Sequence, residues 1–248
     1  MEKILSFNDY EGTYKNSNEL VLEGINLDIF AGKMVAIIGQ SGAGKSTLFA
    51  AILNQLSIKK GDLFIEGKSI QKMSKKDYKN FLQTVGYLTQ GDDLVSTDTV
   101  FKNVYREVKL SNNFFVNLFN LDWKKKQKHV LEILEKLNIF DKAFSLVSEL
   151  SGGQKHRVQI ARLLTNKKKL ILADEPTTGL DIILSQEVID LLKKVNEENH
   201  ATVLVTLHDL NLLENNFEDY VAIREGKILK QGKVEEITKE FIEELYKK

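Results

Sequence analysis

The sequence predicts an α/β fold whose core is a parallel β-sheet with helices on its faces. Three apolar runs have the length of β-strands: Met34–Ile38, Leu170–Ala173 and 201–207. A glycine-rich stretch follows the first run, and apolar residues at helical spacing follow that stretch over 48–53. Apolar residues over 188–195 form one helical face between the other two runs. Strands that alternate with helices in this way build a buried parallel sheet.

The composition limits what such a fold can do. The 248 residues are 42% hydrophobic, which is enough for one large domain or two small ones. Basic and acidic residues number 35 each, so no overall positive field marks nucleic acid as the main partner. The chain has no cysteine, which excludes disulfides and thiolate metal sites and favours a cytosolic address. We expect no signal peptide and no membrane helix, because no window approaches the ~18–20 apolar residues of a membrane span.

Two further segments complete the expected order of elements. Strand-like runs over 220–224 and 227–231 flank Glu225 and Gly226, which predicts an exposed hairpin. The segment from about 91 to 150 has a helical stripe and no convincing strand, so we interpret it as a helical insertion.

Three surface features allow more than one interpretation. Residues 112–123 carry more apolar side chains than a free loop needs, so they form either a docking surface or part of the local core. The lysine-rich runs at 124–128 and 167–169 are typical of solvated surface, although a basic edge can also face an anionic membrane.

The loop after the first predicted strand has the pattern of a phosphate-binding loop. It consists of Gly39, Gln40, Ser41, Gly42, Ala43, Gly44, Lys45, Ser46 and Thr47. A glycine, four residues and then Gly-Lys-Ser, placed between a strand and a helix, is the context that this motif requires. Glycines let backbone N–H groups turn toward phosphate oxygens, and the following helix presents its positive end to the same anion. Lys45 is expected to reach the β- and γ-phosphates of ATP, and Ser46 to offer its hydroxyl to Mg²⁺.

Two carboxylates end the second predicted strand. Asp174 and Glu175 follow the apolar run Leu170–Ala173, at the edge where open α/β sheets bind ligands. Asp174 is the expected Mg²⁺ partner. Glu175 lies just beyond the metal, where a carboxylate can orient or deprotonate the water that attacks the γ-phosphate.

A third motif lies between these two and carries a resemblance. It comprises Leu150, Ser151, Gly152, Gly153 and Gln154. This Leu-Ser-Gly-Gly-Gln sequence resembles the signature motif of ATP-binding cassette (ABC) ATPases, and the chain is identified as a member of that family. Ser151 and Gly153 are expected to head a helix whose hydroxyl and N–H donors face an anion. On a separate helical lobe these donors do not reach the phosphate loop of their own chain.

The resemblance implies a complete architecture. It implies a P-loop NTPase of the ABC ATPase type, with a RecA-like mixed sheet core, an N-terminal antiparallel β portion and an inserted helical subdomain. Residues 1–248 would form a single domain, with the core at about 1–90 and 167–248 and the helical subdomain at about 91–166. It also implies that the signature motif contacts the γ-phosphate of ATP held by a second copy, so that two ATP molecules lie between head-to-tail subunits.

Four more positions match the family's pattern. Gln90 matches the glutamine that contacts Mg²⁺ or the attacking water, and His208 matches the histidine that contacts the γ-phosphate. Asp181 belongs to the stretch 178–181, which matches the loop along the dimer interface. Tyr14 matches the aromatic residue that stacks on adenine; its neighbour Tyr10 competes for that role, and Tyr14 can also be read as a half-buried strand residue.

The resemblance finally implies a role at a membrane. It implies the ATPase subunit of an ABC transporter, peripheral on the cytoplasmic face of the cell membrane, working with transmembrane permease subunits and indirectly with a solute-binding protein. Each permease would insert a short cytoplasmic helix near Gln90. The spacing after Gln90, the 112–123 segment and residues 207–212 look most like phosphonate-type importers. Importers of other solutes, an exporter or lipoprotein-release ATPase, and a non-transport ABC ATPase remain open; a small-molecule kinase has no use for the signature motif.

Overall fold

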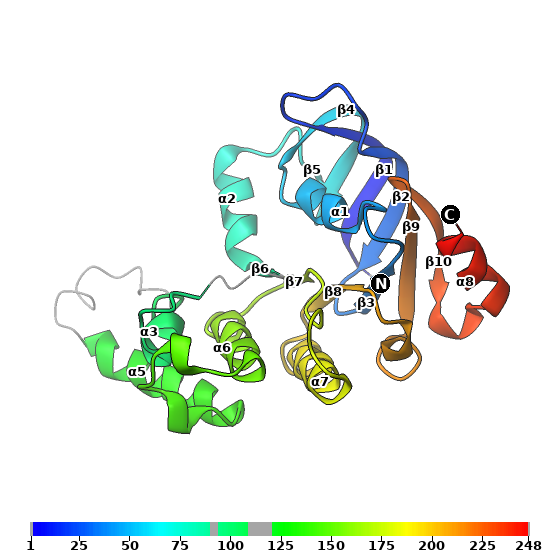
Figure 1. Ribbon diagram of the computed structural model, residues 1–248. Helices are drawn as coiled ribbons and strands as arrows, with labels where there is room; N and C mark the ends of the chain where they lie inside the picture. Colours follow the sequence, from blue (N-terminus) through cyan, green and yellow to red (C-terminus); the bar gives the residue numbers. More distant parts are fainter. Residues whose placement is uncertain (1, 90–93, 109–120, 248) are drawn as a thin grey trace.

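A six-stranded sheet forms the centre of the computed structural model, which describes residues 2–89, 94–108 and 121–247. Its strands lie in the order β10-β9-β3-β8-β7-β6 (Figure 1). The strands are β3 (Met34–Ile38), β6 (Val85–Leu88), β7 (Leu170–Ala173), β8 (Thr202–Leu207), β9 (Asp219–Arg224) and β10 (Lys227–Lys233). All neighbouring pairs are parallel except β9 with β10. The three runs that predicted a parallel sheet are therefore adjacent strands of it.

A second sheet is antiparallel and comes mainly from the N-terminal part of the chain. Its order is β2-β1-β4-β5. The strands are β1 (Lys3–Tyr14), β2 (Leu22–Phe30), β4 (Leu56–Ile65) and β5 (Lys68–Ser69). The expected mixed sheet and N-terminal antiparallel portion are both confirmed.

Helices lie on both faces of the six-stranded sheet and in a separate group beside it. They are α1 (Lys45–Ile52), α2 (Lys75–Thr84), α3 (Val100–Tyr105), α5 (Leu121–Lys136), α6 (Gly152–Leu164), α7 (Ile182–Asn199) and α8 (Lys239–Tyr246). Helix α1 lies on the side of the antiparallel sheet, whereas α7 lies on the opposite side (Figure 1). Helices α3, α5 and α6 form a group at one side of the molecule, in the stretch of about 91–166 for which the resemblance implies a helical subdomain.

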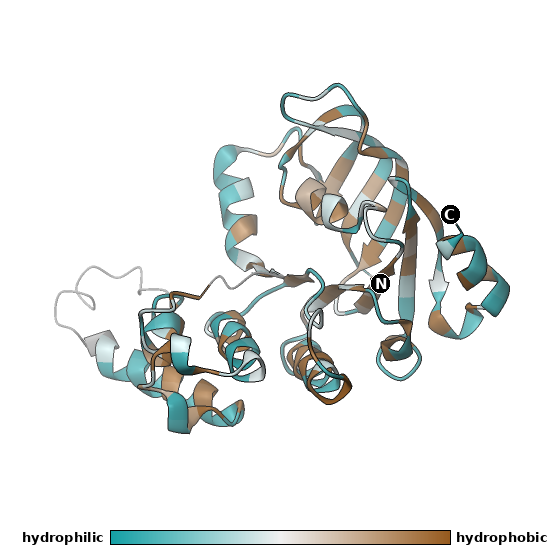
Figure 2. Ribbon diagram, viewed as in Figure 1, coloured by the Kyte–Doolittle hydropathy of each residue, from teal (hydrophilic) through white to brown (hydrophobic). Residues whose placement is uncertain are grey.

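The alternation of side chains along β3 explains why the molecule has two hydrophobic cores. Val35 and Ile37 face the core formed with α1 and the antiparallel sheet. Met34, Ala36 and Ile38 face the core formed with α7 and the helical group. Successive strand residues point to opposite faces, so a strand that is apolar throughout is buried on both. Figure 2 shows hydrophobic residues on the strands, with hydrophilic ones between them in the antiparallel sheet, while α2 is mainly hydrophilic.

The predicted C-terminal hairpin is present but is not exposed as expected. Glu225 and Gly226 both have positive φ angles, 49° and 73°, as a tight hairpin turn requires. Residues 220–223 of β9 are nevertheless buried. The reason is that β9 also pairs with β3 in parallel, which makes β9 an interior strand, so that β10 is the strand of the hairpin that lies at an edge of the sheet.

The described part of the insertion is helical, with one isolated antiparallel bridge between Thr99 and Leu146. The boundaries at about 91 and 166 stay a prediction. Residues 112–120 lie outside the described part, so the choice between docking surface and local core for 112–123 remains open. Lys126 is only 7% exposed, which corrects the expectation that the whole 124–128 run is solvated. It lies four residues before the buried Val130, on the stripe by which α5 packs.

Within the described residues, no helix combines the length and the hydropathy that spanning a bilayer would demand.

Candidate functional site

The predicted phosphate loop connects β3 to α1, and its glycines are needed where they lie. Gly39 has a φ of 155°, and a Cβ at this position would lie 2.2 Å from the Ile223 carbonyl oxygen. Gly44 has a φ of 107° and directly precedes α1. The turn between β9 and β10 braces the loop, because the Gly226 N–H donates to the Ala43 carbonyl at 2.9 Å. The backbone path of the loop therefore depends on glycine at both of its ends.

Lys45, at the start of α1, folds back over this loop. Its side chain is 3% exposed, and its ammonium group donates to the carbonyl oxygens of Gly39 and Gln40, both at 3.0 Å. The ammonium nitrogen also lies 3.7 Å from Glu175 Oε1. Burial lowers the pKa of Lys45, and the carboxylates of Glu175 and Asp174 partly offset that effect. An oxyanion entering the loop would meet a buried cation whose partners, among the residues that the structure describes, are two neutral carbonyls and one carboxylate.

The other predicted loop residues have different degrees of exposure. Ser41, Gly42 and Ser46 are exposed, whereas Ala43 is buried. Gln40 donates from its side-chain amide to the Lys247 carbonyl oxygen at 3.3 Å, so the C-terminal end of the described chain contacts this loop.

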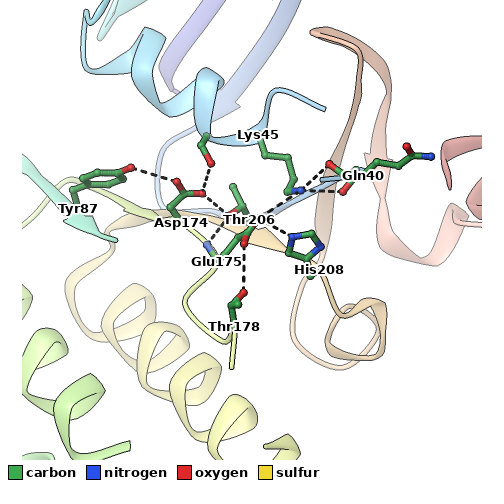
Figure 3. Close-up of polar contacts among 10 residues, drawn as sticks. Gln40, Lys45, Tyr87, Asp174, Glu175, Thr178, Thr206 and His208 are labelled. Carbon is green, nitrogen blue, oxygen red and sulfur yellow. Dashed lines mark hydrogen bonds and ion pairs between the residues drawn. The ribbon is translucent and has the colours of Figure 1, made fainter. Parts of the chain in front are cut away.

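Three hydroxyl groups surround the Asp174 carboxylate, as Figure 3 shows. Ser46 Oγ and Thr206 Oγ1 each donate to Oδ1 at 2.9 Å, and the Tyr87 hydroxyl donates to Oδ2 at 3.4 Å. Burial, followed by the Asp174 charge, raises the pKa of Tyr87 to about 12, so this phenol remains a donor at neutral pH. The fold places Ser46 and Asp174, the two residues expected to bind Mg²⁺, within hydrogen-bonding distance of each other.

The donor set at Asp174 fits Mg²⁺. This ion prefers oxygen ligands and usually takes only one or two from the protein, with the rest from phosphate and water. Ser46 and Asp174 supply one hydroxyl and one carboxylate. Among the described residues, no group of three or more His, Cys, Asp or Glu side chains forms a separate metal cage.

Glu175 is held by contacts on both of its carboxylate oxygens and on its backbone. Oε1 lies 2.8 Å from His208 Nε2, and Oε2 accepts a hydrogen bond from Thr178 Oγ1 at 3.4 Å. Its backbone N–H donates to Thr206 Oγ1 at 2.7 Å. Its φ of 50° is a left-handed conformation that costs a non-glycine residue energy. A carboxylate fixed in this way, next to an imidazole and a buried ammonium, can accept a proton from a bound water.

Sequence reasoning gave Thr206 and Tyr87 no role at this site, and it placed Thr178 only in the 178–181 loop expected at the dimer interface. Thr206 had a usable signal, because it lies two residues before His208 in a predicted strand, so both side chains point to the same face. The contacts of Tyr87 with Asp174 and of Thr178 with Glu175 had none, since they depend on how β6 and the loop after β7 are placed.

The signature motif forms the start of α6. Ser151 caps this helix in a reciprocal pair: Ser151 Oγ accepts from the Gln154 N–H at 3.3 Å, and Gln154 Oε1 accepts from the Ser151 N–H at 3.0 Å. Gly153 lies against α7, where an added Cβ would be 2.8 Å from Leu184 Cδ2, while Gly152 is exposed. Helix α6 belongs to the helical group and lies apart from α1 (Figure 1). The motif and the phosphate loop of one chain are therefore not in one site.

The remaining predicted residues are placed as follows. Asp181 caps α7 by accepting from the Leu184 N–H at 2.9 Å. Tyr10 is 1% exposed and packs edge-on against Phe7, whereas Tyr14 is 47% exposed, with its hydroxyl 3.4 Å from Thr47 Oγ1. Of the two tyrosines, Tyr14 has the ring that a base can reach. Gln90 lies outside the described residues.

Comparisons with known proteins agree with one another. Residues 22–178 match the family model described as ABC transporter. Over 245 residues the chain is 37% identical to a phosphonates import ATP-binding protein (PhnC) of Lactococcus lactis subsp. cremoris, covering 99% of each chain. The solved structure of cbiO1 from Clostridium perfringens, described as part of the ABC transporter complex cbiONQ, is similar with a TM-score of 0.83 and 27% identity, covering 98% of this chain and 93% of that one. The ATP-binding cassette MJ0796, solved as a dimer in a post-hydrolysis state bound to ADP and Pi, gives a TM-score of 0.76 and 29% identity over 92% of this chain and 98% of that one.

Proposed function

Because this chain belongs to the ABC transporter family and is one of its ATP-hydrolysing subunits, we propose that it drives import of a phosphonate or a related phosphorylated solute across the cytoplasmic membrane. The observation that carries the ATP chemistry is the convergence of Lys45, Asp174, Glu175 and His208 at the carboxyl edge of the six-stranded sheet. The direction of transport and the solute rest on full-length similarity to phosphonate import ATP-binding proteins.

In this proposal the phosphates of ATP occupy the loop Gly39–Thr47. Their oxygens replace the carbonyl oxygens of Gly39 and Gln40 as acceptors for the Lys45 ammonium. The N-terminus of α1 adds its positive end to the same anion. Tyr14 offers its exposed ring to adenine, at the side of the loop where its hydroxyl approaches Thr47.

Ser46 and Asp174, with Gln90, would hold the Mg²⁺ ion. When bound, this ion supplies positive charge that offsets the charge on the phosphate oxygens during hydrolysis. The Ser46 hydroxyl already points at the Asp174 carboxylate, so the two ligands need little rearrangement.

Glu175 and His208 would carry the hydrolytic step. Glu175 accepts a proton from the attacking water, whose oxygen bonds to the γ-phosphorus as the bond to the ADP oxygen breaks, giving ADP and phosphate. His208 fixes the Glu175 carboxylate through the 2.8 Å contact and faces the departing phosphate. Lys45 neutralises charge on the β- and γ-phosphates.

A second copy of the chain would complete the site. Ser151, Gly153 and Gln154 provide donors at the N-terminus of α6, but these lie apart from the phosphate loop of the same chain. A head-to-tail arrangement brings the donors of one copy to the ATP of the other, and Asp181 lies along the same interface. The dimeric MJ0796 structure, with its bound ADP and Pi, supports this arrangement.

The membrane partner would dock on the helical group, beside the segment that follows Gln90. Residues 145–148 pair with 96–100 through backbone hydrogen bonds, so the loop before α6 lies next to that segment. Phe101 stacks on Phe144 with ring centroids 5.9 Å apart, and Phe144 is 74% exposed. An exposed aromatic surface of this kind suits a short cytoplasmic helix of a permease subunit. Through the permease, the chain would lie on the cytoplasmic face of the membrane and act indirectly on a solute-binding protein.

Solute uptake in the cell that carries this gene tests the proposal. Replacing the chromosomal copy with the Glu175→Gln variant should abolish uptake of radiolabelled methylphosphonate and leave uptake of inorganic phosphate unchanged. The control is Glu225→Gln, which changes an exposed turn carboxylate. Normal methylphosphonate uptake by the Glu175→Gln strain would contradict the proposed solute, and raised cellular methylphosphonate would contradict the direction.

A further inference from the structure

Two isoleucines at the start of α7 lie almost completely in solvent. Ile182 is 81% exposed and Ile183 is 74% exposed. They follow Asp181, whose side chain caps the helix, so both occupy its first turn. Neither belongs to the buried residues of the two cores or to the hydrophobic residues that pack against them. The first turn of a helix usually carries polar side chains. Two adjacent, large and exposed apolar side chains in that turn add nothing to the packing of a single copy.

The isoleucine pair lies between the two halves of the proposed ATP site. The next residue, Leu184, lies against Gly153 of the signature motif. On the other side, the loop that leads into α7 contacts the catalytic carboxylate, because Thr178 Oγ1 donates to Glu175 Oε2 at 3.4 Å. The pair is thus continuous with the surface that the proposed dimer assigns to a second copy.

We propose that Ile182 and Ile183 form an apolar contact with a second copy of this chain when ATP closes the dimer. This inference rests on the proposed function, which supplies the head-to-tail dimer. The occupant is a second copy because the pair borders both the signature motif and Glu175, and because a cassette that matches 92% of this chain has been solved as a dimer. Two-fold symmetry makes each copy contribute its isoleucines to the closed state.

The isoleucine contact adds a hydrophobic contribution to the free energy of dimer closure, beside the contribution of the bound nucleotide. Removing apolar side chains from water favours association without any specific charge pairing. Closure should therefore remain strong at high salt, where contacts between exposed charges are screened.

Dimer affinity measured in a hydrolysis-deficient chain tests the contact. In the Glu175→Gln background with saturating ATP, sedimentation equilibrium should show that Ile182→Ser with Ile183→Ser raises the dimer dissociation constant by about tenfold or more. The matched control is Leu229→Ser, which removes an exposed aliphatic side chain from β10 at the far edge of the sheet and should leave dimer affinity unchanged. Affinity of the monomer for a fluorescent ATP analogue should be equal in all three chains.

Cross-linking gives a second measurement that does not depend on affinity. The chain has no cysteine, so Ile183→Cys introduces a unique thiol. In the Glu175→Gln background, a benzophenone maleimide attached to this thiol should photo-cross-link two copies with ATP and not without it. Suppose that the Glu175→Gln chain dimerises with ATP. If the double serine substitution then leaves its dimer affinity unchanged, or if Ile183→Cys gives no cross-link, the isoleucine contact alone is overturned. A parent that stays monomeric with ATP overturns the dimer of the proposed function, and the contact with it.

Discussion

Thr206 connects the two carboxylates of the site, and replacing it with valine tests that connection. Its hydroxyl donates to Asp174 Oδ1 at 2.9 Å and accepts from the Glu175 N–H at 2.7 Å, and the residue is fully buried. Thr206→Val keeps the branched shape of the side chain and removes only the hydrogen-bonding group. The change therefore acts on the positions of Asp174 and Glu175, with no cavity to complicate the result.

The expected size of the effect follows from those two hydrogen bonds. Removing one partner of a buried hydrogen bond costs ~1–3 kcal/mol, and more where a charged group is involved. Two such bonds give a loss of about 3 kcal/mol in the free energy of unfolding. For a chain of this length, that loss corresponds to a decrease in Tm of roughly 6–12 °C. Glu175 also loses a contact that holds its left-handed backbone, so kcat should fall by about tenfold or more with ATP affinity little changed.

Scanning calorimetry and steady-state ATP hydrolysis measure these effects, and two variants control for them. Thr206→Ser keeps the hydroxyl and should restore both Tm and kcat. Thr202 lies on the same strand as Thr206 and is equally buried, and its hydroxyl accepts a hydrogen bond from the Gly32 N–H at 3.0 Å. Thr202→Val removes that acceptor, so it should lower Tm and leave kcat unchanged. If Thr206→Val matches the wild type in Tm and kcat, the argument that this hydroxyl positions the carboxylates is wrong.

Three further substitutions test the site. Glu175→Gln should retain ATP binding, lose turnover and form a dimer with ATP in size-exclusion chromatography; a monomeric or active variant would remove its assigned role. Lys45→Ala should lose ATP binding in calorimetric titration because the cation for the phosphates is absent, and normal affinity would contradict the phosphate-loop assignment. Gly39→Ala should lower both Tm and ATP affinity, since its Cβ would lie 2.2 Å from the Ile223 carbonyl oxygen; unchanged thermal unfolding and binding would show that the loop adapts without cost.

Local patterns in the sequence predict much of the sheet and of the phosphate loop. The apolar run Met34–Ile38 predicts a strand, the glycines after it predict a loop, and the helical spacing of the next apolar residues predicts a helix. In the antiparallel sheet, β1 pairs with β4 although β2, β3 and α1 lie between them in the chain, so no local window reveals that pairing. The burial of β9 was likewise missed, because its hairpin signal says nothing of its pairing with β3.

The site shows the same division between local and long-range information. Lys45, Ser46 and Asp174 are predicted as site residues because each lies in a recognisable motif that follows a strand. The choice between Tyr10 and Tyr14 needed the fold, since both lie in β1 and only packing buries the Tyr10 ring. The contacts that the Tyr87 and Thr178 hydroxyls make with Asp174 and Glu175 depend on tertiary placement, which no local pattern predicts.

The left-handed backbone of Glu175 lowers thermal stability, whereas the glutamate side chain serves ATP hydrolysis, so selection for stability and selection for turnover favour different residues at this position. A glutamate at a φ of 50° costs on the order of 1–3 kcal/mol, whereas glycine adopts this conformation freely and asparagine tolerates it. In a laboratory evolution experiment that rewards only heat resistance, glycine and asparagine should therefore accumulate at this position. A screen that also rewards ATP turnover should keep the glutamate, and comparison of the two populations would measure how much stability the chain gives up to hold a carboxylate there.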